Sequence, residues 1–254
     1  MAEPQTGKVV AIAGAAQGVG RAVAQRFAEA GDRVYLIDAD RTQLEKTAKE
    51  IGGTALTADP ADAAALQHAF VQIEQAGGLD AYVHAPAAIV ARAAEEISST
   101  EFENQLVGYV GGAFAGSQLA ARLMFRRSGG SIVHIASVDA IAPRAGYSAV
   151  AAVQAGVLGL TRALGIEWSA RGVRVNAIAH GVVEGNPDSR SEAADRFRMR
   201  TPLGRFGRPA EVAEAVLFLT SDEAQFITAE CLRVDGGWLA YSYFYPAVTN
   251  SEHR

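Results

Sequence analysis

The absences in this sequence narrow its function before any motif is considered. No lysine follows Lys49 in the 254-residue chain, which excludes a catalytic lysine from everything beyond that position. Cys231 is the only cysteine, so an intramolecular disulfide is excluded and a reducing cytosol fits. The first apolar run, Val9 to Ala16, is too short to span a membrane and leads into glycines, not a cleavage site. We therefore expect a cytoplasmic protein.

Basic clusters and several common kinds of site are also absent. The net charge is −5 and no lysine-rich run or aromatic-basic patch occurs, so nucleic acid and anionic membrane are poor candidates as partners. No His/Cys/Asp group has metal-ligand spacing, and no Gly-x-Ser-x-Gly nucleophile elbow occurs. The composition, 49% hydrophobic and 20% charged, is that of a soluble globular protein. With neither an internal repeat nor a linker, we expect one domain over residues 1–254.

The N-terminal segment has the pattern of a nucleotide-binding unit. The apolar run Lys8–Ala13 predicts a strand, and Arg21–Ala30 predicts a helix with one apolar face. The next strand, Arg33–Ile37, ends at Asp38, whose carboxylate suits ribose hydroxyls and favours NAD over NADP. Glycines between strand and helix let the backbone approach a pyrophosphate, although a tight turn without a ligand stays open. The glycines of this loop are Gly14, Gly18 and Gly20.

The central segment carries the strongest motif. It predicts a buried strand over Ile132–Ala136, a loop holding Ser137, and an alanine- and glycine-rich helix at 149–169. In its order of strand, serine-containing loop and helix, this segment resembles the short-chain dehydrogenase/reductase family. That family carries a serine, a tyrosine and a lysine four residues after the tyrosine in this segment. The resemblance covers about residues 8–238. It implies an α/β fold: a single-domain Rossmann-type, doubly wound parallel sheet of about seven strands with helices on both faces.

The two proton-handling residues of that family are missing. Aligning the segment on the family's pattern puts Gln154 at the lysine position and Val150 at the tyrosine position, while Ser137 keeps its place as the retained catalytic residue. A shifted alignment would use Tyr147 as the tyrosine, but it puts Ala151 where the lysine belongs. We therefore expect the frame of an active site without its general acid and base.

Other departures surround the cofactor position. The resemblance places Asp59, at the end of a predicted strand Leu56–Asp59, on the adenine amino group. Pro60 then lacks the backbone N–H that the family uses on the adenine ring. We expect NAD to bind weakly or not at all to this chain. The remaining departures fall at Ala13, Ala85, Pro86, Ala87, Tyr109 and Gly185.

Three histidines are candidates for a replacement base. His84, His134 and His180 fall at the ends of predicted strands, where an open α/β sheet binds ligands. A histidine has a pKa near neutrality and could stand in for the tyrosine. Hydrogen-bonded filling of the core is the commoner role for a histidine at such positions, and both interpretations stay open.

Two helices suggest association. A predicted helix at Thr100–Arg127 carries Gly108, Gly112 and Gly116 on one stripe. Because glycine is a weaker helix former than alanine, close packing on the sheet beneath or on a partner helix should offset the loss of helix stability. The resemblance implies a four-helix interface between subunits, built from this helix and the one at 149–169. We expect a homologous subunit as partner in a hetero- or homo-oligomer, with a tetramer expected, and we expect Gly112→Leu to weaken association. The aromatic tail at 239–254 suggests core or subunit packing, or a cap over a neighbour's pocket.

Three functional hypotheses remain. The first is a degenerate subunit paired with an active homologous NAD-dependent hydroxyacyl or alcohol dehydrogenase. The second is a divergent enzyme, redox or not, that uses Tyr147, His180 or Ser137. The third is a regulator that senses dinucleotides. Family residues are missing at the adenine end of the cofactor position, at its nicotinamide end and at the catalytic positions, and no coherent set of new polar groups replaces them. This pattern favours the first hypothesis.

Overall fold

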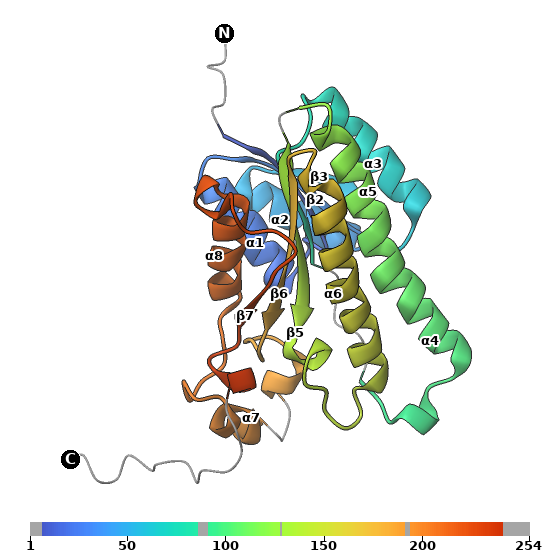
Figure 1. Ribbon diagram of the computed structural model, residues 1–254, viewed down its shortest axis with the longest axis vertical. Helices are drawn as coiled ribbons and strands as arrows, with labels where there is room; N and C mark the ends of the chain where they lie inside the picture. The colour runs from blue at the N-terminus through green and yellow to red at the C-terminus, as the bar shows by residue number, and fades with distance from the viewer. Residues whose placement is uncertain (1–6, 86–90, 128, 191–193, 241–254) are drawn as a thin grey trace, which may run out of the picture.

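The computed structural model describes residues 7–85, 91–127, 129–190 and 194–240. Seven parallel strands form one sheet in the order β3-β2-β1-β4-β5-β6-β7, with helices on both faces (Figure 1). The strand order reverses between β1 and β4, the point at which open α/β sheets bind ligands beyond the carboxyl ends of their strands. The strands are β1 (Val9–Ala13), β2 (Arg33–Asp38), β3 (Thr54–Thr57), β4 (Ala81–His84), β5 (Gly130–Ser137), β6 (Val173–His180) and β7 (Cys231–Val234).

Two helical layers cover the sheet, and the helices α1, α2, α3, α5, α6 and α8 bury apolar side chains toward it. The layer on one face comprises α1 (Gly18–Glu29), α2 (Arg41–Ile51) and α8 (Pro209–Thr220), whose apolar side chains share a core with the strands. The other layer comprises α3 (Ala63–Gln75), α4 (Ser99–Leu106), α5 (Gly112–Met124) and α6 (Ser148–Ser169). The short helix α7 (Ala194–Arg200) lies beyond the carboxyl ends of β5 and β6 (Figure 1).

The predicted fold class is confirmed, with three differences in the elements. The third strand runs over Thr54–Thr57, two residues earlier than predicted. The predicted helix at Thr100–Arg127 is broken into α4 and α5 by a π-helical turn at Val107–Gly111. Two helices, α2 and α8, were not predicted; α2 has a local signal in Asp40, whose side chain caps its N-terminus by accepting from Gln43 N–H.

The glycine stripe on α5 faces the inside of the subunit. A Cβ on Gly112 would lie 2.5 Å from the carbonyl oxygen of Pro60, and one on Gly116 would collide with the hydroxyl of Tyr82. Both positions therefore need glycine for packing within the chain. The expected weakening of association by Gly112→Leu stays a prediction, but the substitution would also displace the loop at Pro60 within the subunit.

Helix α6 is the one helix among the described residues that is long and apolar enough to cross a membrane. Half of its most apolar window is buried inside the protein. Its inward side chains, such as Leu164 and Trp168, belong to the core between helix and sheet. Its apolar character is thus that of a core helix.

Candidate functional site

The glycine loop between β1 and α1 has the form that a dinucleotide requires. Gly14 and Gly18 adopt φ values of +83° and +58°, and a Cβ on Gly20 would collide with the carbonyl oxygen of Gly14. Helix α1 begins after Gln17, which supplies no side-chain cap, and its first turn carries no acid. Its N-terminal N–H groups and positive dipole end are thus directed at the loop, an arrangement that suits a diphosphate.

The two predicted acidic residues follow neighbouring strands at the same edge of the sheet. Asp38 ends β2 and accepts hydrogen bonds from the backbone N–H groups of Ala16 and Asp40, both at 3.0 Å. It therefore braces the glycine loop while remaining partly exposed. Asp59 follows β3, is exposed, and accepts from the N–H of Ala61 at 2.9 Å. These residues fit a dinucleotide: the loop would hold the diphosphate, Asp38 the ribose and Asp59 the adenine.

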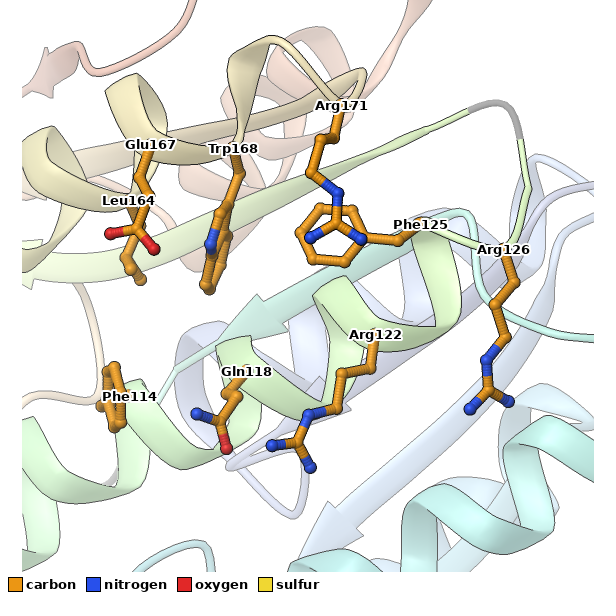
Figure 2. A pocket seen from close by; sticks show the side chains of 9 residues that line it. All are labelled: Phe114, Gln118, Arg122, Phe125, Arg126, Leu164, Glu167, Trp168 and Arg171. Atoms are coloured by element: carbon orange, nitrogen blue, oxygen red, sulfur yellow. The ribbon is translucent and has the colours of Figure 1, made fainter.

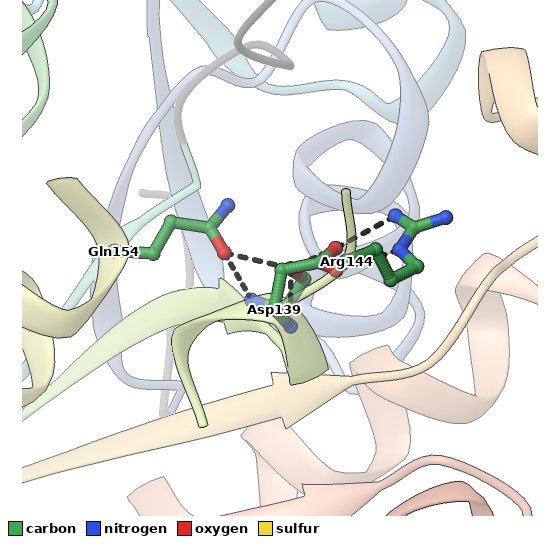
Figure 3. Close-up of polar contacts among 4 residues, drawn as sticks. Asp139, Arg144 and Gln154 are labelled. Carbon is green, nitrogen blue, oxygen red and sulfur yellow. Dashed lines mark hydrogen bonds and ion pairs between the residues drawn. The ribbon is translucent and has the colours of Figure 1, made fainter. Parts of the chain in front are cut away.

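Ser137 is hydrogen-bonded to Gln154, the side chain at the family's lysine position; Figure 3 shows Gln154 next to Asp139 and Arg144. Its hydroxyl lies 2.7 Å from Gln154 Oε1 and donates to it, and its backbone N–H donates to the same oxygen at 3.0 Å. The Gln154 amide also lies 3.5 Å from the hydroxyl of Tyr109. Gln154 is only 7% exposed, so this arrangement is held by packing as well as by hydrogen bonds.

The side chains at the family's lysine and tyrosine positions do not titrate. Gln154 is a neutral amide, and Val150 at the tyrosine position is apolar and buried. Burial raises the pKa of Tyr109 to about 12, so its hydroxyl stays protonated at neutral pH. Gln154 and Val150 therefore cannot perform the proton transfer of a tyrosine–lysine pair.

Beside Ser137 lies a buried ion pair that the sequence did not predict. Arg144 donates to both carboxylate oxygens of Asp139, at 2.7 and 2.8 Å, and the two side chains are 14% and 5% exposed. Asp139 Oδ2 also lies 3.2 Å from the Ser137 hydroxyl. The carboxylate therefore joins the arginine to the serine (Figure 3).

Arg144 is part of a larger stack that reaches α7. Its guanidinium carbon lies 3.7 Å from the ring centroid of Tyr147 and 4.9 Å from that of Phe197 on α7. The Phe197 and Trp238 rings lie 6.0 Å apart, and Arg200 lies 4.6 Å from the Trp238 ring. We call these five residues the arginine–aromatic stack. Tyr147, a predicted candidate, thus has its ring face against a cation.

His180 lies next to Ser137, as predicted for a residue at the ligand edge. The two residues pair in the register between β5 and β6. His180 Nδ1 lies 2.7 Å from the carbonyl oxygen of Gly181, which assigns the proton to Nδ1 and leaves Nε2 as an acceptor. Burial lowers the pKa of His180, partly offset by Gly181 and Asp139, so the ring is neutral at pH 7.

The other two histidines belong to the core. His134 lies inside β5 opposite His84, and its ring nitrogens each lie 2.8 Å from a hydroxyl, of Ser117 and Thr161. Its predicted position at a strand end is wrong, because β5 continues to Ser137. Both histidines are fully buried, and burial lowers their pKa values to about 4 for His84 and about 3 for His134.

The remaining predicted positions are small or lie outside the described residues. Ala13 and Ala85 are buried, and Gly185 has a φ of +85° with open space around its Cβ position. None of these three supplies a polar side chain to a cofactor. Pro86, Ala87 and the aromatic tail at 241–245 lie outside the described residues.

A separate groove of about 560 Å³ lies on the outer surface of α5 and α6. Figure 2 shows Phe114 of α5 and Trp168 of α6 on opposite sides of it, with Arg171 stacked on Phe125. Both apolar and charged side chains line it. Both helices end at this region and lead into the amino ends of β5 and β6, so the groove lies away from Ser137. It is a surface feature and no part of the candidate catalytic site.

Comparisons with known proteins agree on one family. Residues 14–239 match the family described as enoyl-(acyl carrier protein) reductase. The chain is 34% identical to galactitol 2-dehydrogenase of Cereibacter sphaeroides, covering 92% of this chain and 96% of the relative. It is 33% identical to a 3-oxoacyl-(acyl-carrier-protein) reductase of Thermotoga maritima, covering 91% and 97%. The structure of a 3-ketoacyl-(acyl-carrier-protein) reductase from Brucella melitensis complexed with NADH superposes with a TM-score of 0.86 at 30% identity, covering 91% and 98%.

Proposed function

Because this chain belongs to the short-chain dehydrogenase/reductase family, we propose a role built on that oxidoreductase fold but without its proton-transfer step. The chain is a non-catalytic subunit. It works beside an active homologous NAD-dependent hydroxyacyl or alcohol dehydrogenase in a mixed oligomer. The partner performs the redox chemistry, and this chain contributes its fold and its interface.

The observation that carries the proposal is the hydrogen bond from Ser137 to Gln154. Reduction of a ketone needs a proton for the developing alkoxide as the hydride arrives. Val150 has no proton to give, and Gln154 has no charge with which to lower a neighbour's pKa. The serine hydroxyl is itself engaged at 2.7 Å, so orienting a substrate oxygen would require breaking that bond first.

The cofactor is NAD, bound weakly in this chain. The glycine loop and Asp38 suit a dinucleotide, whose nicotinamide, when bound, supplies or accepts a hydride. Ala13, Pro60 and Gly185 each remove a group that the family places on it, at about 0.5–1.5 kcal/mol per hydrogen bond. Three losses weaken binding by about one to three orders of magnitude. Calorimetry should give a high-micromolar constant for NADH or no binding; a low-micromolar constant would contradict this.

A divergent enzyme is the second candidate, and His180 is what favours it. Its Nε2 is an acceptor on a neutral ring, and it lies one strand from Ser137. Tyr147 is the nearest tyrosine in sequence to the family's position. A bell-shaped dependence of turnover on pH that His180→Asn flattens would favour this candidate.

The partner surface proposed here is the groove of α5 and α6. Phe114 is 45% exposed at its edge, and an exposed aromatic beside arginines is typical of an interface. Co-expression with a homologue that retains serine, tyrosine and lysine should give one species containing both chains in native mass measurement. Phe114→Ser should weaken it by about tenfold or more, while Phe226→Ser, at a fully exposed phenylalanine elsewhere, should not. Two separate homo-oligomers would contradict the proposal.

A further inference from the structure

The glycine loop between β1 and α1 uses some of its backbone N–H groups inside the chain and leaves others for a ligand. The N–H groups of residues 14–16 donate to the Ile37 carbonyl and the Asp38 carboxylate, at 2.8 to 3.3 Å. Within α1 the first donor is the N–H of Arg21, which lies 3.2 Å from the N-cap carbonyl oxygen. The N–H groups of residues 18–20 precede it and have no acceptor within the helix. They form a compact set of donors for a diphosphate.

Asp38 offers the remaining capacity of its carboxylate beside these donors. Its two oxygens each accept one backbone N–H at 3.0 Å, from Ala16 and from Asp40. A carboxylate oxygen has two lone pairs, so one on each oxygen remains for the two hydroxyls of a ribose. The exposed carboxylate of Asp40 adds a second negative charge two residues further on. A phosphate on the ribose 2′ position would therefore be repelled.

The other half of this edge, at the ends of β4, β5 and β6, keeps its polar side chains engaged within the chain. Ser137 donates to Gln154 at 2.7 Å, Asp139 is held by a two-pronged ion pair, and His180 Nδ1 lies 2.7 Å from a backbone carbonyl oxygen. His180 Nε2 is left as an acceptor on a neutral ring. The apolar side chains of this half are buried, at Ala85, Val150, Val182 and Val183. A ligand group placed here would have to break an internal hydrogen bond to gain most of the available ones.

We propose that this chain recognises the adenosine diphosphate half of its ligand alone, through the N–H groups of residues 18–20 and the carboxylate of Asp38. ADP-ribose and ADP then bind as tightly as the complete dinucleotide, and the nicotinamide half adds no affinity. The ligand class is an adenosine diphosphate with free ribose hydroxyls. The inference rests on the proposed function, under which no chemistry takes place at the nicotinamide end, and it names what the retained half of the site binds.

Calorimetry with the purified full chain tests the inference on matched ligands. NADH and ADP-ribose carry the same charge and differ in the nicotinamide, so their dissociation constants should agree within about twofold; one hydrogen bond to the nicotinamide would separate them by about two- to tenfold. ADP should bind no more weakly than ADP-ribose. Nicotinamide mononucleotide should give no heat of binding at millimolar concentration, and NADPH should bind about tenfold more weakly than NADH because of its 2′-phosphate.

Two substitutions locate the binding energy on the retained half. Asp38→Asn should weaken NADH and ADP-ribose by the same factor, about tenfold or more, because hydrogen bonds to a charged group are lost. Asp222→Asn, at an exposed aspartate in the short 3-10 helix Asp222–Ala224, is the matched control and should change neither. Asp38 also braces the loop, so Gln17→Glu is the second variant. It changes an exposed side chain at the N-cap of α1, and its charge should repel the diphosphate of both ligands about fivefold at an unchanged melting temperature.

The possible results separate this inference from the proposed function. Binding of NADH that is tighter than that of ADP-ribose by more than about twofold would overturn the inference, and so would the absence of binding by every nucleotide at millimolar concentration. Neither result supplies a proton donor, so the non-catalytic role would stand. NADPH binding as tightly as NADH would overturn the assignment of Asp38 to the ribose. Equal binding of NADH and ADP-ribose in the low-micromolar range would support the inference while contradicting the weak binding proposed above.

Discussion

Acid should destabilise this protein through two histidines that are fully buried in the sheet. His84 and His134 are fully buried in β4 and β5, and their pKa values are lowered to about 4 and about 3. In the unfolded chain a histidine titrates near 6.5. Between these values the unfolded state binds more protons than the native state, so stability falls as the pH falls.

The size of this loss follows from the width of that window. At pH 5 the pH is about 1.5 units below the pKa of each histidine in the unfolded chain, while each histidine in the native protein is still neutral. The free energy of unfolding therefore falls by about 2 kcal/mol per histidine, at 1.36 kcal/mol per pH unit. The pair therefore removes about 4 kcal/mol between pH 7.5 and pH 5, a large share of a typical domain's 5–15 kcal/mol. His180, whose pKa is lowered as well, adds to the loss in the same direction.

Urea unfolding followed by circular dichroism at pH 7.5, 6.5 and 5 measures the loss. His134→Gln retains hydrogen-bonding capacity toward Ser117 and Thr161 but does not titrate, and it should reduce the loss by about half. His68→Gln, at an exposed position on α3, is the control and should leave the pH dependence as it is. A wild-type stability that stays level from pH 7.5 to pH 5 would refute the reasoning.

Two further substitutions test the packing around the site. Gly112→Leu forces a side chain against the Pro60 carbonyl and should destabilise the subunit by about 1–3 kcal/mol or more. The control is Gly159→Leu, whose Cβ position is open within the chain, and it should leave the melting temperature of the isolated subunit nearly unchanged. Equal effects of the two substitutions in thermal melts would contradict the inward orientation of the α5 stripe. Gln154→Leu removes the acceptor of two Ser137 hydrogen bonds and should cost about 1–3 kcal/mol in urea unfolding, and a neutral result would mean that the amide does not hold Ser137.

The sheet and the glycine loop could be predicted because their signals are local. Apolar runs such as Lys8–Ala13 are followed within a few residues by glycines, a helix and Asp38, and that order fixes which residues meet at the edge of a parallel sheet. The structure brings Gly14, Gly20 and Asp38 together as expected. The positions of Ser137 and Gln154 followed from spacing, although their direct hydrogen bond did not.

Other features depend on partners distant in the sequence. The contact of Arg144 with Phe197, and that of Phe197 with Trp238, join segments that carry no common motif. A glycine stripe shows that something packs closely, but not on which side; for Gly112 the neighbour is Pro60, which precedes the helix by about fifty residues. The predicted strand Ile132–Ala136 ends one residue before β5 does and already held His134 inside it, so the assignment of His134 to the ligand edge did not follow from the strand itself.

The central claim is that this chain lacks its own proton transfer, and turnover by the purified protein tests it most directly. NADH oxidation with ketone and 3-oxoacyl substrates, and NAD reduction with the corresponding alcohols, should remain at background at saturating nucleotide. Val150→Tyr combined with Gln154→Lys restores the missing side chains and should raise the rate above that of the unmodified chain, though only to a trace. Turnover by the unmodified chain at ordinary dehydrogenase rates, about 1 per second or faster, would contradict the account.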